Sequence, residues 1–172
     1  MAELFVEILG KPHGIIVFQL LAACRFTIYL SLIAFIGGGA VACLITLFRI
    51  SKNSSLQRLA ASFIWIFQSV PLLMLLFLIG LGLPRLLDIN IDPWTAATFA
   101  LVLFTSAYLA EVWRGAVESV AKGQWEASFA LNMEYSLLLR KVIIPQALKF
   151  GIAPTVGFMV QIIKGTSIAY II

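Results

Sequence analysis

The chain has 172 residues, of which 62% are hydrophobic and only 12% are charged, and its formal net charge at pH 7 is +4. A water-soluble domain of this length cannot bury so much apolar surface, so the composition predicts an all-α integral membrane protein. The long apolar runs are continuous rather than alternating, which excludes a β-barrel, and the basic residues are spread over short loops, which argues against nucleic-acid binding.

The first 25 residues are interpreted as an N-terminal arm with a short apolar lead-in. Glu3 and Glu7 stand where a cleaved signal peptide would carry basic residues, so we do not expect such a peptide. Residues 14–24 are apolar, but there are only eleven of them and Arg25 follows. We therefore expect this lead-in to lie at the membrane interface, ahead of a transmembrane domain over residues 26–172.

Four apolar segments approach or exceed the roughly 20 residues that cross a bilayer as a helix; they are residues 26–48, 62–84, 94–113 and 147–172. Pro71 is expected to kink the second segment. The third has a tryptophan at each end, as in the aromatic belts of membrane proteins. The fourth is interrupted by Lys149, Pro154 and the run Lys164-Gly165-Thr166-Ser167.

The two cysteines, Cys24 and Cys43, lie in apolar segments and lack the spacing of metal ligands. We interpret them as small buried hydrophobic residues rather than as a disulfide or a metal site. The sequence therefore predicts no metal.

Loop charges predict the orientation, because cytoplasmic loops of membrane proteins carry an excess of Lys and Arg. The loop after the first span has the basic residues Arg49, Lys52 and Arg58. The loop after the third span is also basic, with Arg114, Lys122, Arg140, Lys141 and Lys149. The N-terminal arm, with Glu3, Glu7 and Lys11, and the loop with Arg85, Asp88 and Asp92 are net negative. We therefore expect the N-terminus outside and the loop over residues 114–147 in the cytoplasm.

This long loop has its own predicted structure. Residues 124–131 are expected to form a short helix, and a second helix is expected from Glu134. Asn132 lies between them, where a tight corner needs a residue that tolerates positive φ. Glu126 is expected near the N-terminal end of the first helix, where the helix dipole favours a carboxylate. Pro145 is expected to end the second helix. Such a bent helix suits docking to a partner, and an ordinary solvated connection is the alternative.

The same loop resembles a known signature. Glu126-Ala127-Ser128 is followed after three residues by Asn132, and after nine more by Val142-Ile143-Ile144-Pro145. ATP-binding cassette (ABC) transporter permeases carry Glu-Ala-Ala, three residues, Gly, nine residues and Ile-x-Leu-Pro in a cytoplasmic loop. The spacing is the same throughout, and the four substitutions are conservative.

Further stretches resemble the polar amino-acid uptake branch of these permeases, whose substrates include histidine, glutamate, glutamine, arginine and opines. They are Gln68-Ser69-Val70-Pro71-Leu72-Leu73, Tyr108-Leu109-Ala110-Glu111-Val112-Trp113-Arg114-Gly115, Lys122-Gly123-Gln124-Trp125-Glu126-Ala127, Pro145-Gln146-Ala147-Leu148 and Lys164-Gly165-Thr166-Ser167-Ile168. The resemblance covers the chain from about Phe26 to Ile172. It implies the transmembrane domain of a type I ABC importer with five transmembrane helices, the last of which is missing from this chain.

The resemblance also implies partners. A permease of this type sits in the bacterial inner membrane with a periplasmic N-terminus, pairs with a second permease subunit, binds cytosolic ABC ATPases and receives its substrate from a periplasmic binding protein. The chain has no Gly-x-x-x-x-Gly-Lys-Ser/Thr motif, so ATP would be bound and hydrolysed by the partner. The chain itself is expected to be no enzyme and to need no cofactor. A pore-forming or structural membrane subunit that is not coupled to an ATPase is the alternative.

Two sets of site residues follow. Coupling to the ATPase is expected at Gly123, Gln124, Glu126, Ala127, Ser128, Asn132 and Pro145. The substrate path is expected at Glu111, Lys164, Gly165, Thr166 and Ser167.

The expected depth of Lys164 in the bilayer supports the substrate-path residues. Lys164 follows Lys149 by fifteen residues, which is about 22 Å of helix and lies past the bilayer midplane. Charged groups at such depth usually line a cavity, and Gly165 can break the helix there. The alternative for Lys164 is that its side chain snorkels to the interface. Glu111 and Arg114 are expected to pair on one helix, either as a stabilising interfacial pair or with a role in coupling.

One departure bears on the substrate. The branch usually has Asp at the position of Gly165. Without that carboxylate, we expect a neutral or acidic amino acid rather than a cationic one.

Overall fold

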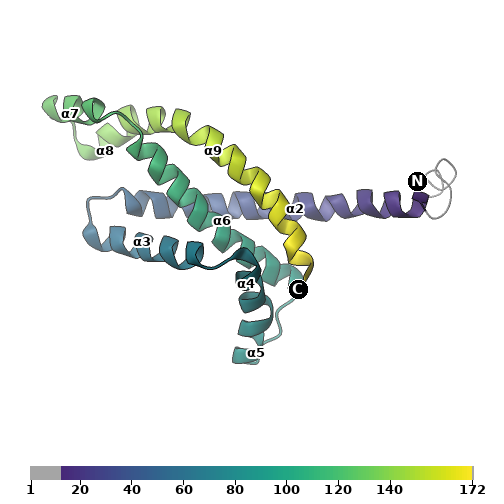
Figure 1. Cartoon of the computed structure of the whole chain (residues 1–172). Coiled ribbons are helices and arrows are strands. Elements are labelled where there is room, and N and C mark those ends of the chain that lie inside the picture. The colour runs from purple at the N-terminus through teal and green to yellow at the C-terminus, as the bar shows by residue number, and fades with distance from the viewer. Residues whose placement is uncertain (1–12, 172) are drawn as a thin grey trace.

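The computed structural model describes residues 13–171, and the acidic residues of the N-terminal arm lie outside this range. All regular elements within it are helical (Figure 1). In chain order they are α2 (His13–Arg49), α3 (Ser54–Ser69), α4 (Leu72–Phe77), the π-helical η1 (Leu78–Gly82), α5 (Leu83–Leu87), α6 (Pro93–Glu118), α7 (Lys122–Ala130), α8 (Tyr135–Leu138), the π-helical η2 (Leu139–Ile143), α9 (Ile144–Gly165) and the 3-10 helix η3 (Thr166–Ile171).

Three helical stretches of the described chain are long and apolar enough to cross a membrane. They are α2, α6 and the continuous stretch Tyr135–Ala169, which contains α9. The pair formed by α3 and Leu72–Leu87 also qualifies, but its two parts are bent by 98°. The structure therefore confirms an all-helical membrane architecture, with four spans only if the bent pair counts as one.

The lead-in and the first span form one helix. α2 runs for 37 residues without a break at Arg25, which is about 55 Å of helix. The N-terminal part of α2 extends beyond the other helices (Figure 1). The guanidinium of Arg25 lies over the ring of Phe26, 4.8 Å from the ring centroid. That the lead-in lies at the membrane interface stays a prediction.

The second apolar segment bends at Pro71, where the sequence predicts a kink, and its two helical parts meet at 98°. That the two parts form a single span stays a prediction. α3 ends at Ser69, and Val70 has extended backbone angles with φ of −100° and ψ of 122°. A residue before proline avoids the helical region because it would clash with the proline ring. The helical axis therefore restarts after Pro71 in a new direction, and α4 and α5 turn away from the bundle (Figure 1).

Two π-helical segments each precede a proline. η1 ends two residues before Pro84, and η2 ends two residues before Pro145. A proline donates no hydrogen bond and its ring crowds the carbonyl four residues earlier, and a π-bulge widens the turn there. The helix therefore continues through Pro145, and the prediction that Pro145 ends it is wrong. α9 also contains Pro154 and Lys149 without interruption.

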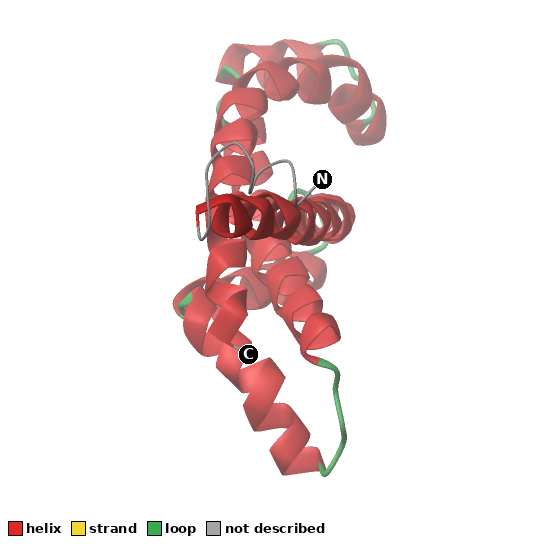
Figure 2. Ribbon diagram, turned by 90° about the vertical axis from the view of Figure 1, so that its right-hand side faces the viewer, coloured by secondary structure: helices red, strands yellow, loops and turns green. Residues whose placement is uncertain are grey.

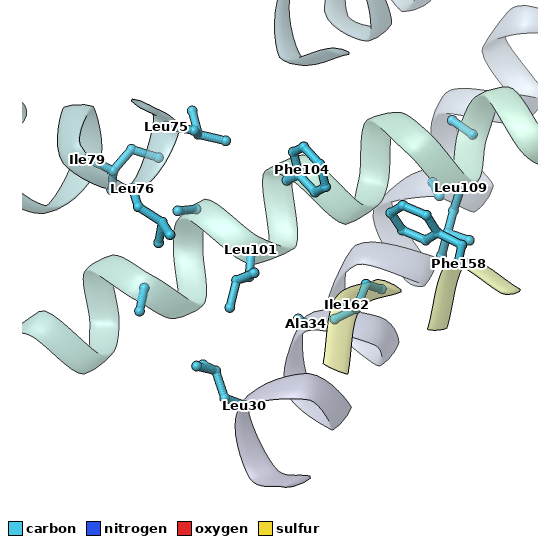
Figure 3. Close-up of a cluster of buried hydrophobic side chains, with 14 of the residues drawn as sticks. Leu30, Ala34, Leu75, Leu76, Ile79, Leu101, Phe104, Leu109, Phe158 and Ile162 are labelled. Carbon is cyan, nitrogen blue, oxygen red and sulfur yellow. The ribbon is translucent and has the colours of Figure 1, made fainter. Parts of the chain in front are cut away.

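The core lies around α6, which packs against α2, α3, α4 and α9. The buried side chains of the core come from all these helices, and α3 contributes Ala60 and Ile64. Figure 3 shows core side chains of the other helices, among them Leu30, Leu76, Leu101, Leu109, Phe158 and Ile162. α2 approaches α6 closely because Gly38 lies against Thr105, where an added Cβ would be 2.6 Å from the threonine Cβ. The rings of Tyr108 and Phe158 stack at 5.3 Å between centroids and tie α9 to α6.

Both cysteines are exposed on α2 in this chain. The prediction that they are buried is therefore wrong, because an apolar membrane helix presents apolar side chains to lipid as well as to its neighbours.

Candidate functional site

A short helical loop projects from one end of the bundle. At this end α2 and α6 finish and α3 and α9 begin, and α7 lies outside them (Figures 1 and 2). We call it the α7 end. The hydroxyl of Tyr135 donates a hydrogen bond of 2.5 Å to the carbonyl of Ile50, 85 residues away. This contact fastens the loop to the end of α2.

The corner after α7 has the predicted geometry. Asn132 has a φ of 52°, and its N–H donates to the carbonyl of Phe129 at 2.9 Å. The N–H of Met133 donates to the carbonyl of Ser128 at 3.1 Å. Such a left-handed residue with returning hydrogen bonds ends a helix, and Asn tolerates it better than most residues do. The prediction of a positive φ at Asn132 is confirmed.

The start of α7 differs from expectation. The helix begins at Lys122, its N-cap is Ala121, and no side chain caps it. Glu126 therefore lies in the second turn rather than the first, where the effect of the helix dipole has already fallen off. The predicted dipole stabilisation of Glu126 does not apply, and its carboxylate remains an exposed charge on the surface of α7.

The predicted coupling residues fall on two sides of α7. Gly123, Gln124, Glu126 and Ala127 are exposed, and no atom lies within 4 Å of a Cβ added at Gly123. Ser128 is only 4% exposed, and its hydroxyl donates to the carbonyl of Gln124 at 2.7 Å. Ser128 therefore packs inward, while the other residues form an accessible surface.

Sequence reasoning missed two apolar residues of this surface. Phe129 is 54% exposed and Leu131 is 77% exposed. The sequence does indicate them, because Phe129 and Leu131 are large apolar residues within a polar loop. Exposed apolar side chains next to charged ones are typical of a protein-binding surface.

The loop is joined to α9 by a pair of glutamines. The side-chain amide of Gln146 donates to the side-chain oxygen of Gln124 at 3.2 Å and to the carbonyl of Val142 at 2.9 Å. Gln146 follows Pro145 at the start of α9. The structure therefore brings together Gln124 on α7 and the Pro145 region on α9, which the sequence separates by about twenty residues.

Glu111 and Arg114 form the predicted pair on α6. The guanidinium of Arg114 donates to both carboxylate oxygens of Glu111, at 2.8 and 2.5 Å. Arg114 also forms an ion pair with Glu118. A bidentate pair of this kind fixes the arginine, and the second carboxylate was not anticipated although it stands four residues further along the helix.

Lys164 lines an open pocket of about 330 Å³ between α4, α6 and α9. Its other lining residues are Leu72, Leu101, Phe104, Gln161, Ile162, Gly165 and Ile168. Gln161 was missed, although it precedes Lys164 by three residues and so lies on the same side of the helix. This pocket holds a lysine and an amide in largely apolar surroundings.

The other predicted substrate-path residues are placed differently. The α-helix ends at Gly165 and passes into η3, and a Cβ added at Gly165 would be 3.0 Å from Leu72. Thr166 is buried and its hydroxyl donates to the carbonyl of Ile163 at 2.7 Å, while Ser167 is exposed. Gly165 lines the Lys164 pocket, but Thr166, Ser167 and Glu111 do not. The predicted substrate-path set is therefore not one cluster.

The known proteins that resemble this chain are transport permeases. The family described as "Binding-protein-dependent transport system inner membrane component" matches residues 34–172. The chain is 33% identical to a probable amino-acid ABC transporter permease protein of Bacillus subtilis, over 86% of this chain and 65% of that protein. It is 35% identical to the L-cystine transport system permease protein of the same organism, over 84% and 61%, and 35% identical to the nopaline transport system permease protein of Agrobacterium fabrum, over 88% and 66%.

Solved structures agree. The crystal structure of an amino acid ABC transporter with histidines is similar with a TM-score of 0.84 and 29% identity, over 92% of this chain and 74% of that chain. An inward-facing conformation of the MetNI methionine ABC transporter has the same fold, with a TM-score of 0.65 and 22% identity over 91% and 74%. This chain spans between 61% and 66% of the length of the three relatives named above. It belongs to the family of binding-protein-dependent transport system inner membrane components.

Proposed function

We propose that this chain is the membrane-spanning permease subunit of an ATP-driven ABC importer that carries a polar amino acid. The observation that carries the proposal is α7, a short helix outside the bundle with an exposed acidic and apolar surface. Relatives named as amino-acid, cystine and nopaline permeases support the substrate class. In this arrangement ATP is hydrolysed by a separate cytosolic subunit, and a binding protein delivers the substrate.

The loop charges support an orientation. Arg49, Lys52, Arg140 and Lys141 all belong to the α7 end, whereas Asp88 and Asp92 belong to the opposite end. By the positive-inside rule the α7 end is cytoplasmic, which puts the N-terminus on the periplasmic side. A binding protein would then meet the end formed by α5 and the start of α6.

In the proposed mechanism, α7 transmits movement of the ATPase to α9. A movement of the docked ATPase shifts α7, and the hydrogen bond between Gln124 and Gln146 passes this shift to the start of α9. α9 is continuous from Ile144 to Gly165, and Lys164 stands at its far end beside the pocket. A continuous helix therefore connects the proposed ATPase contact with the proposed substrate path. A second permease subunit completes this path.

Reversing the charge of Glu126 tests the coupling role. Glu126→Lys replaces an exposed carboxylate, so the protein should insert and fold as before while transport and stimulation of the ATPase fall at least tenfold. Glu134→Lys is the matched control, because it makes the same change in the same loop but outside α7. ATP-dependent uptake and ATPase activity are measured in proteoliposomes. Unaltered activity of Glu126→Lys would contradict the proposed contact.

A pore-forming or structural subunit is the second candidate, and it needs no ATPase. Co-purification of the chain with an ABC ATPase, followed by uptake assays with and without ATP, separates the two. Uptake that proceeds without ATP and without an associated ATPase would favour the pore.

For the substrate path we propose that Lys164 faces the carboxylate of the substrate, with Gln161 beside it. The Lys164 side chain is exposed at this open pocket, so a substrate carboxylate can reach its ammonium. Lys164→Met should therefore reduce uptake roughly fivefold or more, the factor for about 1 kcal/mol of a lost charged hydrogen bond. Uptake of labelled glutamate, glutamine and arginine is compared in both proteins. A preference for arginine, or unchanged uptake by Lys164→Met, would contradict this assignment.

A further inference from the structure

A second and larger cavity lies along the first half of α9, whereas the Lys164 pocket lies at the other end of this helix. It is a groove of about 480 Å³ between the last two turns of α2, the end of α6 and the first half of α9, at the α7 end. Its walls include Leu47, Leu148, Ile152 and Val156, whose side chains are between 46% and 62% exposed. The proposed transport cycle makes no use of this groove.

The polar side chains that line the groove are already engaged with the protein. The indole N–H of Trp113 donates to the hydroxyl of Thr155 at 3.0 Å, and that hydroxyl donates to the carbonyl of Gly151 at 2.6 Å. The hydroxyl of Thr46 donates to the carbonyl of Ala42 at 2.8 Å. A polar ligand would find few partners here and would lose its hydration, so the groove fits an apolar occupant.

The length of the groove matches one leaflet of a bilayer. On α9 the lining residues run from Ile144 to Val156, which is about 18 Å of helix at 1.5 Å per residue. Half of a hydrocarbon core of about 30 Å is about 15 Å. An extended acyl chain from the leaflet at the α7 end would therefore lie along the groove.

The mouth of the groove is basic. Arg49 precedes the lining residue Ile50, Lys52 follows it, and Arg140 and Lys141 precede the lining residue Ile144. The ammonium of Lys52 lies 4.8 Å from the ring centroid of Tyr135, which holds it near the end of α2. The acidic residues at the α7 end are Glu126, which is exposed on α7, Glu134, which accepts a hydrogen bond from Ser136, and Glu111 and Glu118, which are paired with Arg114. These four carboxylates are outnumbered by the basic residues Arg49, Lys52, Arg114, Lys122, Arg140 and Lys141. The excess charge at the mouth is positive.

We propose that this groove binds one acyl chain of an anionic phospholipid from the leaflet at the α7 end, with the lipid phosphate against the basic residues of the mouth. Apolar walls bind the chain, and the basic mouth selects the headgroup charge. Such a lipid would join α2, α6 and α9 at the end where α7 is attached, so it would stabilise the part of the molecule that the loop acts on.

Tryptophan quenching by brominated lipids tests the proposal on the full chain. Trp113 lines the groove, whereas Trp65 lies on α3 with 73% exposure and serves as the control. Two variants retain only Trp113 or only Trp65, with the other tryptophans changed to Phe. Each is placed in phosphatidylcholine vesicles with a minor fraction of phosphatidylglycerol, and the acyl chains of one lipid or the other are brominated.

We expect brominated phosphatidylglycerol to quench Trp113 roughly fivefold more strongly per mole fraction than brominated phosphatidylcholine, the factor for one basic group near the surface. Trp65 should be quenched equally by both lipids. Equal quenching of Trp113 by both would overturn the selection of anionic lipid. If neither lipid quenches Trp113 while Trp65 is quenched, protein covers the groove and the proposal is wrong.

Charge variants in the single-Trp113 background test the mouth. Lys52→Gln combined with Lys141→Gln should abolish the preference for phosphatidylglycerol, while Arg85→Gln, a charge loss at the opposite end of the molecule, should preserve it. A preference that survives the double variant would show that the mouth does not select the lipid. Cys43→Phe, which narrows the groove, should weaken the quenching of Trp113, whereas Cys24→Phe, outside it on the same helix, should not.

Discussion

Asn132 is the residue at which local backbone geometry bears most directly on the proposed coupling surface. Its φ of 52° reverses the chain directly after α7 and leaves Phe129 and Leu131 exposed beside it. An L-residue with a branched β-carbon is strained in this region, because its side chain crowds the backbone. The turn that follows α7 therefore depends on the residue type at position 132.

Substitution of Asn132 should discriminate between glycine and a β-branched residue. Asn132→Gly should leave the thermal midpoint in detergent unchanged, and Asn132→Val should cost about 1–2 kcal/mol because the left-handed conformation is then strained. Leu131→Val is the control, since Leu131 has a φ of −81° that valine tolerates. Similar midpoints for the glycine and valine variants would mean that the corner carries no strain.

At the scale of elements, close packing of α2 on α6 holds the bundle together. Membrane helices gain no hydrophobic free energy from association in lipid, so small residues that allow close approach matter most. Gly37 and Gly38 face Val102 and Thr105 across this interface. The contact between α2 and α6 also supports the groove, because both helices form its walls.

Gly38→Ala should therefore disrupt this helix pair. The added Cβ would be 2.6 Å from two atoms of Thr105 and 3.1 Å from the carbonyl of Val102, and such overpacking typically costs about 1–3 kcal/mol. Gly115→Ala on α6 is the matched control, because nothing lies within 4 Å of its added Cβ. Thermal midpoints of the two variants are compared in detergent. An unchanged midpoint for Gly38→Ala would show that the helices can separate without loss.

At the scale of the whole molecule, contacts between distant residues hold the α7 end in one piece. The hydrogen bond from Tyr135 to Ile50 joins the loop to α2, and that from Gln146 to Gln124 joins α9 to α7. A small buried cluster that includes Val117, Leu138 and Ile143 lies beneath them. The loop is therefore held by both α2 and α9, so a displacement of α7 can reach these helices.

Tyr135→Phe should loosen the loop without unfolding the bundle. It removes one hydrogen bond and leaves the Ile50 carbonyl without its side-chain donor, at a cost of about 1 kcal/mol. Limited proteolysis should then cut between α7 and α8 several times faster. Tyr29→Phe on the exposed face of α2 should leave the rate of cleavage unchanged. Equal rates in both variants would show that the bond does not hold the loop.

The sequence by itself determined what depends on neighbours along the chain. Hydropathy determined that the protein is a helical membrane protein, in which α2 and α6 are long and apolar enough to cross a membrane. Spacing determined the pair between Glu111 and Arg114 and the positive φ of Asn132, because a helix brings residues three and four apart together and a tight corner admits few residue types. Shared motifs indicated the family.

Only the tertiary structure decided how distant segments meet. Pro71 predicts a bend, but the angle of 98° depends on what α3 and α4 pack against. The exposure of Cys43, the pocket that Gln161 and Lys164 line and the separation of Glu111 from that pocket depend on which helix faces which neighbour. Hydropathy does not carry this information, because in a membrane an apolar side chain is equally acceptable against lipid and against another helix.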